Sequence, residues 1–354
     1  MAGHAARAVG RTAAFAVLGI TALLLAGCTT DGPPRPTETP EPTEPTRAVP
    51  AAVAAPAPIA FAPIRGTLVE PGAAAHPSLG VKIDNHVDAR PQVALNRADV
   101  VFEELVEGGI TRYLSIWQSD VPDEIGPVRS IRPMDPDIIT PFGGLIAYSG
   151  GQEQFVDMMM STPLPNLVFD YDDTGLFYRA DERPGPHDVI LKAAEAVARY
   201  PELPPPPVLG AYGAADPLAA PRFAAQPTSR IDAVFSDARF PSWEWDGANG
   251  VWLRSQEGDP DFEASGDRVR ATNVVTIRLS IDWSYGEVPR TVLDGGGEAW
   301  VSVGGRTAHG AWSKAGRESM LALTADDGSP LPLAPGTTWF ELVPLEDGSV
   351  AFAP

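Results

Sequence analysis

The sequence has little cysteine, lysine or histidine: its 354 residues include one cysteine, three lysines and five histidines. A single cysteine excludes an intramolecular disulfide and a cysteine-based zinc site. Basic residues are also scarce, with 26 against 46 acidic ones and a formal net charge of −20. Nucleic-acid binding depends on cationic side chains that displace counterions, so this charge argues against a nucleic-acid partner. After residue 27, no apolar run is long enough to span a bilayer.

The first 27 residues have the pattern of an export signal. They contain Arg7 and Arg11, no acidic residue, and an apolar run from Ala13 to Ala26. The run ends in Leu25-Ala26-Gly27-Cys28, which resembles a bacterial lipobox and places the single cysteine where a lipobox requires it. The resemblance implies cleavage before Cys28 and lipidation of its thiol, for example with palmitate. The lipid then holds the protein at the extracytoplasmic face of the cell membrane; an ordinary signal peptide or an uncleaved anchor is the alternative.

Residues 28–58 are expected to form a tether between the lipid and the folded body. Residues 31–58 are mainly proline, threonine, glutamate and alanine, and such a segment stays extended because it has little to bury. A proline-rich recognition motif is the alternative. Further along, Pro204–Pro207 can neither continue a helix nor enter a central strand. We therefore expect two folded domains, over residues 59–207 and 208–354.

Strand and helix patterns alternate in residues 59–207. The predicted helices are Gln152–Met160 and Leu191–Tyr200. Glycines typical of a hairpin join the second and third of the predicted strands, which are Leu79–Ile83, Val100–Val106, Thr111–Gln118 and Leu145–Tyr148. Mixed strands and helices indicate an α/β layer structure.

Residues 208–354 are predicted to be mostly β. The candidate strands are Ile231–Phe235, Trp243–Trp245, Gly250–Arg254, Val274–Ile281, Ala311–Lys314, Ser319–Thr324 and Trp339–Val343. Gly295-Gly296-Gly297 is predicted as a turn. Short strands at this spacing suggest a sandwich or a barrel-like sheet. The expected fold class is therefore α+β in two domains, an α/β N-terminal domain and a β-rich C-terminal domain.

Several long polar motifs carry a family resemblance. They are IDNH-x-DARPQ from Ile83, VEGGITR from Val106 and IGPVRS-x-RP from Ile125, followed by WEWD from Trp243 and APGTTWFELVP from Ala334. Together they resemble the DUF3048 (YerB-like) family of bacterial lipoproteins, over roughly residues 64–346. The resemblance implies an envelope lipoprotein with an α/β N-terminal domain and no established substrate. Tyr148 and Asp188 stand where the family usually has histidine and asparagine.

The polar residues of these motifs predict a ligand-binding cleft. Asp84 and Asn85 follow an apolar strand, where the loops of an α/β sheet often carry a site. The guanidinium group of arginine can donate two parallel hydrogen bonds to a carboxylate or phosphate group. Backbone N–H groups before a helix suit an anion. Alternatively, the same residues form ion pairs between loops or join the two domains. The candidate ligand-binding residues are Asp84, Asn85, Arg90, Glu103, Glu107, Arg112, Arg129, Arg132, Ser149, Gly150 and Arg179.

The sequence does not decide whether the protein is an enzyme, but it favours a protein that catalyses no reaction. Asp84 and Glu107 are the candidate acid and base of a wall-glycan or peptide hydrolase, assisted by His187. Asp188 either orients His187 as a general base or caps a helix that follows. The histidines are not at zinc spacing, and no cofactor loop is recognisable, so no metal or cofactor is predicted.

Two further features have alternative interpretations. Asp170, Asp172 and Asp173 suit calcium or a solvated acidic loop. The tryptophans of the C-terminal part offer a platform for sugar rings or pack in the core of a sheet; those on one predicted hairpin are Trp243, Trp245 and Trp252. Without a recognisable nucleophile or metal set, we expect a binding or scaffold module that contacts a cell-wall polymer or a wall-synthesis protein.

Overall fold

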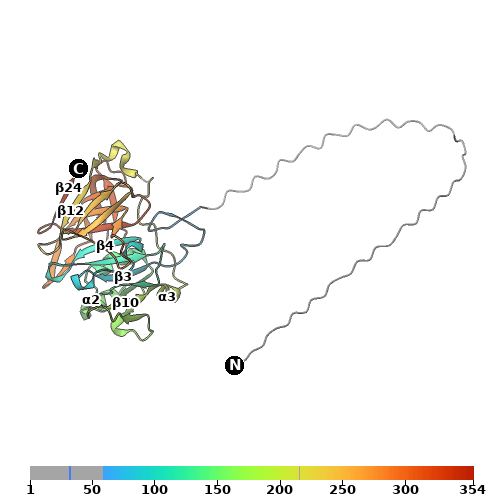
Figure 1. Ribbon diagram of the computed structural model, residues 1–354, viewed down its shortest axis with the longest axis vertical. Coiled ribbons are helices and arrows are strands. Elements are labelled where there is room, and N and C mark those ends of the chain that lie inside the picture. The colour runs from blue at the N-terminus through green and yellow to red at the C-terminus, as the bar shows by residue number, and fades with distance from the viewer. Residues whose placement is uncertain (1–31, 33–58, 215) are drawn as a thin grey trace, which may run out of the picture. The chain divides into compact units, whose positions relative to one another are not determined.

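A mixed β-sheet runs through both halves of the folded chain. The computed structural model describes residue 32, residues 59–214 and residues 216–354. The sheet, which includes the strands β3 and β4 labelled in Figure 1, has eleven strands, in the order β11 (Gln226–Pro227), β21 (Arg306–Lys314), β20 (Gly295–Val303), β17 (Asn273–Leu279), β23 (Thr338–Pro344), β4 (Val100–Leu105), β5 (Thr111–Trp117), β3 (Leu79–Asp84), β7 (Leu145–Tyr148) and β8 (Asn166–Val168), with β22 (Ala322–Ala325) beside β21.

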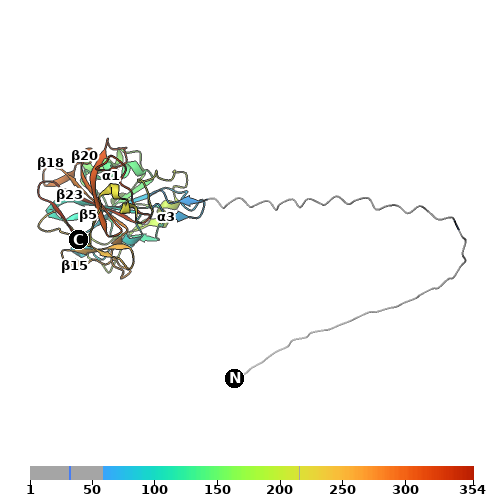
Figure 2. The same cartoon turned by 90° about the horizontal axis from the view of Figure 1, so that it is seen from above.

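Strand β23 joins the two halves of the sheet. It pairs in parallel with β17 on one side and with β4 on the other. In that register Phe340 lies opposite Phe102, and their rings stack with centroids 4.7 Å apart. Figure 2 shows β20, β23 and β5 of this sheet from above. Residues on both sides of Pro204–Pro207 therefore share one sheet.

The central strands are buried on both faces. Successive side chains of a strand point to opposite faces, so Val101 and Phe102 enter different hydrophobic clusters. On the Phe102 face, the cluster includes side chains of three segments: α1 (Asp135–Ile139), the turn Thr140–Phe142 and α2 (Glu153–Met160). On the Val101 face, it includes Trp243 and Trp252, together with alanines of α3 (Ala193–Ala198). The result is a sheet with a hydrophobic core on each side.

Smaller sheets complete the body. A six-stranded sheet holds β15 (Asp259–Pro260), β14 (Val251–Gln256), β13 (Ser242–Asp246), β12 (Arg230–Val234), β24 (Ser349–Ala353) and, beside β14, β16 (Arg270–Ala271). The others are β6 (Glu124–Ile125), β10 (Val189–Lys192) and β9 (Phe177–Arg179); β1 (Ala60–Phe61) and β2 (Leu68–Val69); and β18 (Ile281–Tyr285) and β19 (Val288–Thr291). Single 3-10 turns occur at Val87–Ala89, Leu95–Arg97, Glu107–Gly109, Thr140–Phe142, Phe169–Tyr171, Pro217–Ala219 and Pro221–Phe223.

A fully buried lysine lies in the N-terminal part of the sheet. Lys82 of β3 places its Nζ 2.8 Å from Oδ1 of Asp135 in α1, and it also forms an ion pair with Glu104 of β4. Burial lowers the pKa of Lys82 to about 8, although the charge of Asp135 opposes this effect. The contacts tie helix α1 to two central strands.

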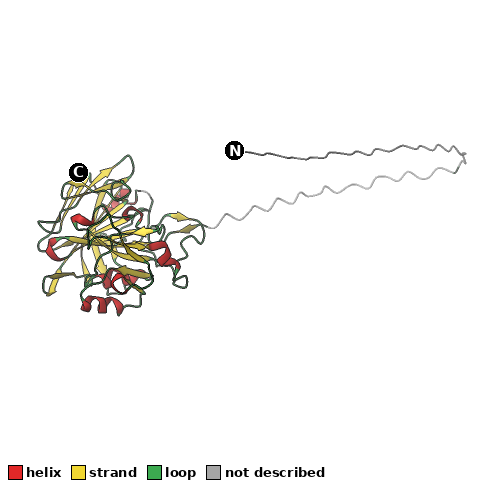
Figure 3. Cartoon of the chain, turned by 60° about the horizontal axis from the view of Figure 1, so that its bottom comes forward, coloured by secondary structure: helices red, strands yellow, loops and turns green. Residues whose placement is uncertain are grey.

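The structure confirms most predicted strands and corrects the predicted helices. Helix α2 and the β4–β5 hairpin lie where the sequence predicts them. The predicted helix Leu191–Tyr200 is wrong at its start, because β10 extends to Lys192 and the helix begins only at Ala193. The α/β expectation for residues 59–207 overestimates helix: α1, α2 and α3 have five, eight and six residues (Figure 3).

The C-terminal part also differs from expectation. Gly295-Gly296-Gly297 is not a turn, because these residues begin β20 and pair with Lys314, Ser313 and Trp312 of β21. The strands do not form a sandwich or barrel of their own. They divide between the eleven-stranded sheet and the six-stranded sheet. The fold is thus β-rich, with a sheet shared by both parts.

The structure does not test the predictions made for the first 58 residues. The export signal over residues 1–27 and the tether over residues 28–58 lie outside the described residues, apart from Gly32. Within the described part of the chain, no helix has the length and apolar character needed to cross a membrane.

Candidate functional site

The end of strand β3 brings charged residues together. Asp84 is the last residue of β3 and lies opposite Arg112 of β5. A segment after β6 runs beside them: Val128 bridges Ile83, and the Arg129 N–H donates to the Lys82 carbonyl at 2.8 Å. These pairings bring the segment that carries Arg129 and Arg132 alongside the end of β3.

Asp84 is almost fully buried and has three partners. Its Oδ2 lies 2.7 Å from Nδ1 of His187 and 3.2 Å from Nε of Arg129, and its Oδ1 accepts the His86 N–H at 3.0 Å. Burial opposes the ionisation of Asp84, but the hydrogen bonds from His86 and His187 and the charges of Arg112 and Arg129 outweigh it and lower the pKa. An ionised Asp84 requires the proton of a neutral His187 to sit on Nδ1, so its Nε2 is free to accept a proton or bind an ion.

Three arginines form a positively charged group, which we call the arginine cluster: Arg112, Arg129 and Arg132. Nη1 of Arg112 donates to the Ser130 carbonyl at 2.8 Å, and Nη1 of Arg132 reaches the same oxygen at 3.4 Å. Burial lowers the pKa of Arg112, and repulsion from Arg132 and Arg129 adds to this effect against the attraction of Asp84. The side chains of Arg129 and Arg132 are 23% and 10% exposed, so part of this positively charged group is within reach of an added anion.

Glu107 lies between the arginine cluster and a surface hollow. Its Oε2 lies 2.6 Å from Nε of Arg132. The hollow has a volume of about 460 Å³, and Trp283 in its wall is 49% exposed. The other lining residues include Glu107, Phe235, Ser236, Glu287 and Asp347. An exposed indole beside carboxylates suits a sugar ring, which stacks on the indole and donates hydroxyl hydrogen bonds.

Neither of the two carboxylates proposed for catalysis has the raised pKa of a general acid. Burial tends to raise the pKa of Glu107, but the hydrogen bond and charge of Arg132 outweigh it and lower the pKa, as happens at Asp84. Both groups are therefore ionised at neutral pH. A glycosidase needs one carboxylic acid that keeps its proton, with a raised pKa. The electrostatics of Asp84 and Glu107 therefore favour binding over hydrolysis.

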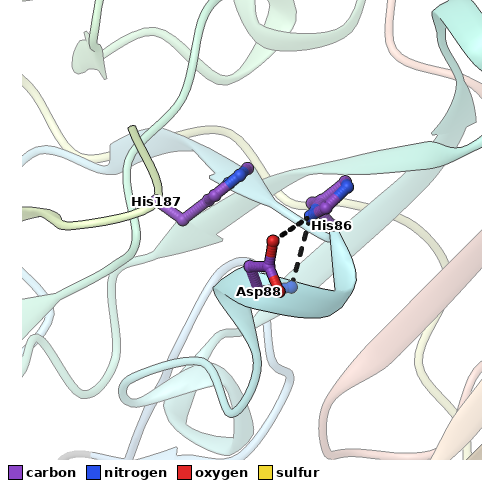
Figure 4. A group of neighbouring side chains, drawn as sticks. All are labelled: His86, Asp88 and His187. Carbon is purple, nitrogen blue, oxygen red and sulfur yellow. Dashed lines mark hydrogen bonds and ion pairs between the residues drawn. The ribbon is translucent and has the colours of Figure 1, made fainter. Parts of the chain in front are cut away.

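Two histidines that are distant in the sequence are neighbours in the structure. The rings of His86 and His187 stack with centroids 4.6 Å apart and planes 9° apart, and Asp88 lies beside them (Figure 4). The Asp88 N–H donates to Nδ1 of His86 at 3.2 Å. These three side chains are the one group of metal-ligand type found in the described residues. Sequence spacing missed it because the loop before β10 supplies His187.

Both interpretations of Asp188 are wrong. Asp84, rather than Asp188, orients His187. Asp188 caps no helix, since strand β10 follows it and α3 has no side-chain cap. Its Oδ1 instead accepts from Nη1 of Arg179 at 2.6 Å. Arg179 also lies over the Phe169 ring, 4.9 Å from the centroid, and away from the contacts of the arginine cluster.

Asn85 and Arg90 contact the C-terminal part of the chain. Nε of Arg90 donates to the Asn85 side chain at 3.0 Å, and its Nη1 lies 3.2 Å from Glu257. The Asn85 carbonyl accepts from Nη2 of Arg239 at 3.3 Å. For these residues the structure supports the alternative that the motifs join the two parts of the chain.

Glu103 belongs to a buried ionic group that the sequence did not reveal. Arg254 lies 2.6 Å from Oε2 of Glu103 and 2.5 Å from Oδ2 of Asp261, and its guanidinium lies 4.9 Å from the Trp339 ring centroid. All of these side chains are buried, so no ligand reaches Glu103 in this conformation. Arg254 follows Trp252 by two residues, and nothing in the local sequence indicates its buried pairing with Glu103.

Glu341 gives this buried group a dependence on pH. Glu341 lies on β23, opposite Glu103 on β4. Burial, followed by the charge of Glu103, raises the pKa of Glu341 well above the usual value. A raised folded-state pKa gives stability that is complete below the unfolded-state pKa and is lost as pH rises through the folded-state pKa. We expect Glu341→Gln, which keeps an acceptor for Trp243, to lose less stability than the wild type as pH rises above the ordinary glutamate pKa.

Melting temperature measured across that pH range by calorimetry tests this expectation. Glu346→Gln is the matched control, because Glu346 is exposed. Parallel pH profiles for the wild type and Glu341→Gln would contradict it.

Ser149 and Gly150 position the loop of the arginine cluster. The Ser149 N–H donates to the Arg129 carbonyl at 2.9 Å, and the Gly150 carbonyl accepts from Ile131 at 3.1 Å. Gly150 has φ +147°, and a Cβ there would lie 2.0 Å from Oδ2 of Asp170, so glycine is required. The N-cap of α2 is Gln152, so the Ser149 N–H is not one of the free amides of that helix.

The two remaining alternatives concern tryptophans and an acidic loop. Trp243 and Trp252 are fully buried, which confirms core packing over a sugar platform for them. Asp172 accepts from the backbone and hydroxyl of Thr174, at 3.0 and 2.5 Å, within its own loop. Neither feature contributes to the site around Asp84.

Comparison with known proteins agrees with this fold. Two family models match: the "Protein of unknown function (DUF3048) N-terminal domain" over residues 66–203, and the corresponding C-terminal domain over residues 231–340. YerB of Bacillus subtilis (strain 168), a candidate lipoprotein by its name, is 28% identical over 301 residues, which are 81% of this chain and 87% of YerB.

A solved structure also has this fold. A crystal structure of the YerB protein from Bacillus subtilis matches with a TM-score of 0.70 at 23% identity, over 82% of this chain and 99% of that chain. The likeness shows a shared fold, and the two family models together cover most of the described chain. Because both family models match and the motifs around Asp84 agree with them, we conclude that the chain belongs to the DUF3048 family.

Proposed function

We propose that this protein is a lipid-anchored module of the cell envelope that binds an anionic cell-wall glycan at the arginine cluster. The lipobox at Cys28 supports the anchor at the extracytoplasmic face, and so does the name of the relative YerB. The observation that carries the proposal is the arginine cluster itself, in which three arginines face two carboxylates.

The negative charge of the whole chain restricts the places where an anionic polymer can bind, and the arginine cluster is such a place. With a formal net charge of −20, the protein repels an anionic polymer over most of its surface. Arg112, Arg129 and Arg132 outnumber the two carboxylates, Asp84 and Glu107, whose pKa they lower. Arginine forks bind carboxylate or phosphate groups with two parallel hydrogen bonds.

The hollow beside Glu107 supports a glycan over a simple anion. Because Glu107 contacts Arg132 and also lines the hollow, one ligand can span both. The exposed Trp283 would stack on a sugar ring while the arginines bind an acidic substituent. Wall glycans carry such substituents on sugar chains. A wall-synthesis protein with an acidic surface is the other occupant that this charge pattern suits.

The test is a binding titration of the purified full chain with isolated glycan strands, muropeptides and phosphate-bearing wall polymers. We expect Arg129→Ala and Arg132→Ala each to weaken binding about tenfold or more, because a charge-assisted hydrogen bond contributes about 1.5–3 kcal/mol. Arg270→Ala is the control, since Arg270 is exposed on β16. Melting temperatures show whether each variant stays folded.

Two results would count against the proposal. Equal affinity in the wild type and both cluster variants would show that the arginines do not bind the ligand. New cleavage products in mass spectra of the glycan, absent with Asp84→Asn or Glu107→Gln, would show a hydrolase instead.

A further inference from the structure

We infer that His86, Asp88 and His187 form a binding site for a divalent transition-metal ion of the zinc type. Each side chain offers one donor atom, and these atoms all lie within 4.8 Å of one another (Figure 4). The donors come from the turn after β3 and the loop before β10. The inference does not depend on the ligand proposed for the arginine cluster.

His187 is already held as a metal ligand would be. Its Nδ1 lies 2.7 Å from Oδ2 of the buried Asp84, and its side chain is 12% exposed. In metal sites, a ligating histidine almost always uses its second nitrogen to donate to a carboxylate or carbonyl. Asp84 therefore fixes the ring and leaves Nε2 of His187 as the donor. Arg129, on the same carboxylate oxygen, keeps Asp84 in place.

His86 and Asp88 supply the adjustable part of the site. Their side chains are 38% and 55% exposed, and Nδ1 of His86 lies 3.5 Å from Oδ2 of Asp88. An imidazole nitrogen binds an ion in the plane of its own ring, so two parallel stacked rings do not point at one ion. Binding therefore turns the exposed His86 ring out of the stack while His187 stays fixed. The closeness of the donors makes this a side-chain movement alone.

The donor types select the ion. Imidazole nitrogens suit zinc and its first-row neighbours, whereas calcium and magnesium prefer oxygen ligands. Two histidines and one carboxylate leave a fourth position open to water or to a ligand atom. In this respect the site is more similar to zinc sites that accept an exogenous ligand than to structural zinc sites, in which all four positions are filled by protein.

The experiment uses the untagged full chain after treatment with a chelator. Calorimetric titration with zinc chloride should show one site, and cobalt(II) should give the visible absorption bands of a low-symmetry, histidine-ligated ion. We expect His86→Gln and Asp88→Asn each to weaken zinc binding at least about tenfold, because even loss of an outer hydrogen-bond partner costs about 10–100-fold. Both residues are partly exposed, so the variants should keep the wild-type melting temperature.

His309→Gln is the matched control. His309 on β21 is also paired with a carboxylate, 2.8 Å from Asp326, but lies outside this group of donors. Its affinity for zinc should equal that of the wild type. Absence of zinc binding, unchanged affinity in His86→Gln and Asp88→Asn, or loss of binding in His309→Gln would each overturn the inference. If the protein binds the glycan but fails to bind zinc, the proposed function stands and this metal site is removed.

Discussion

Replacing Arg254 with leucine is expected to lower the free energy of unfolding by about 3–5 kcal/mol. The guanidinium is fully buried and lies 2.6 Å from Glu103 and 2.5 Å from Asp261. Leucine fills part of the space but leaves both carboxylates buried without a cation. The loss is a large fraction of the stability of an ordinary domain, which is about 5–15 kcal/mol.

Urea unfolding followed by tryptophan fluorescence measures this effect, because Trp243 and Trp339 surround the guanidinium. Arg270→Leu is the control: this arginine is exposed on β16, so its loss should change stability by less than about 0.5 kcal/mol. Adding Glu103→Gln to Arg254→Leu should recover part of the loss by removing one unpaired charge. Equal stability of Arg254→Leu and Arg270→Leu would contradict the expected role of the buried pair.

The second large effect is expected for Lys82→Met. Methionine matches the length of the lysine stem, so packing is kept while the ammonium group is lost. Glu104 and Asp135 then remain buried without their cation, and we expect a loss of about 3–5 kcal/mol. The change also removes the contact that ties α1 to β3 and β4.

Lys192→Met provides the matched comparison, since Lys192 at the end of β10 is only partly buried. Its stability should stay within about 0.5 kcal/mol of the wild type. The measurement is again urea unfolding, now at pH 7. A loss below 1 kcal/mol for Lys82→Met would mean that Glu104 and Asp135 take up protons or water without cost, against the expectation.

The sequence predicts local elements well because their signals are local. The β4–β5 hairpin follows from two apolar runs and the glycines between them, and β7 follows from one buried run. No local signal shows that β23 enters between β17 and β4, since that pairing joins segments at opposite ends of the chain. Gly295–Gly297 looks like a turn because glycine is typical of turns, although these residues begin β20 and pair with β21.

The candidate site was predictable to a similar degree. Asp84, Arg112 and Arg129 come from long motifs, and the structure brings them together. The role of His187 was not predictable, because the carboxylate that orients it lies on β3 and not beside it in the sequence. Glu103 was predicted as a ligand-binding residue, but burial by Arg254 gives it a structural role.

The position of β23 has a consequence for the order in which the protein can fold. Strand β4 exposes a row of unpaired backbone groups along one edge until residues 338–344 have been synthesised, long after β4 itself. Open strand edges of this kind pair readily with other chains. The N-terminal part of the sheet therefore stays incomplete on this edge until β23 is available.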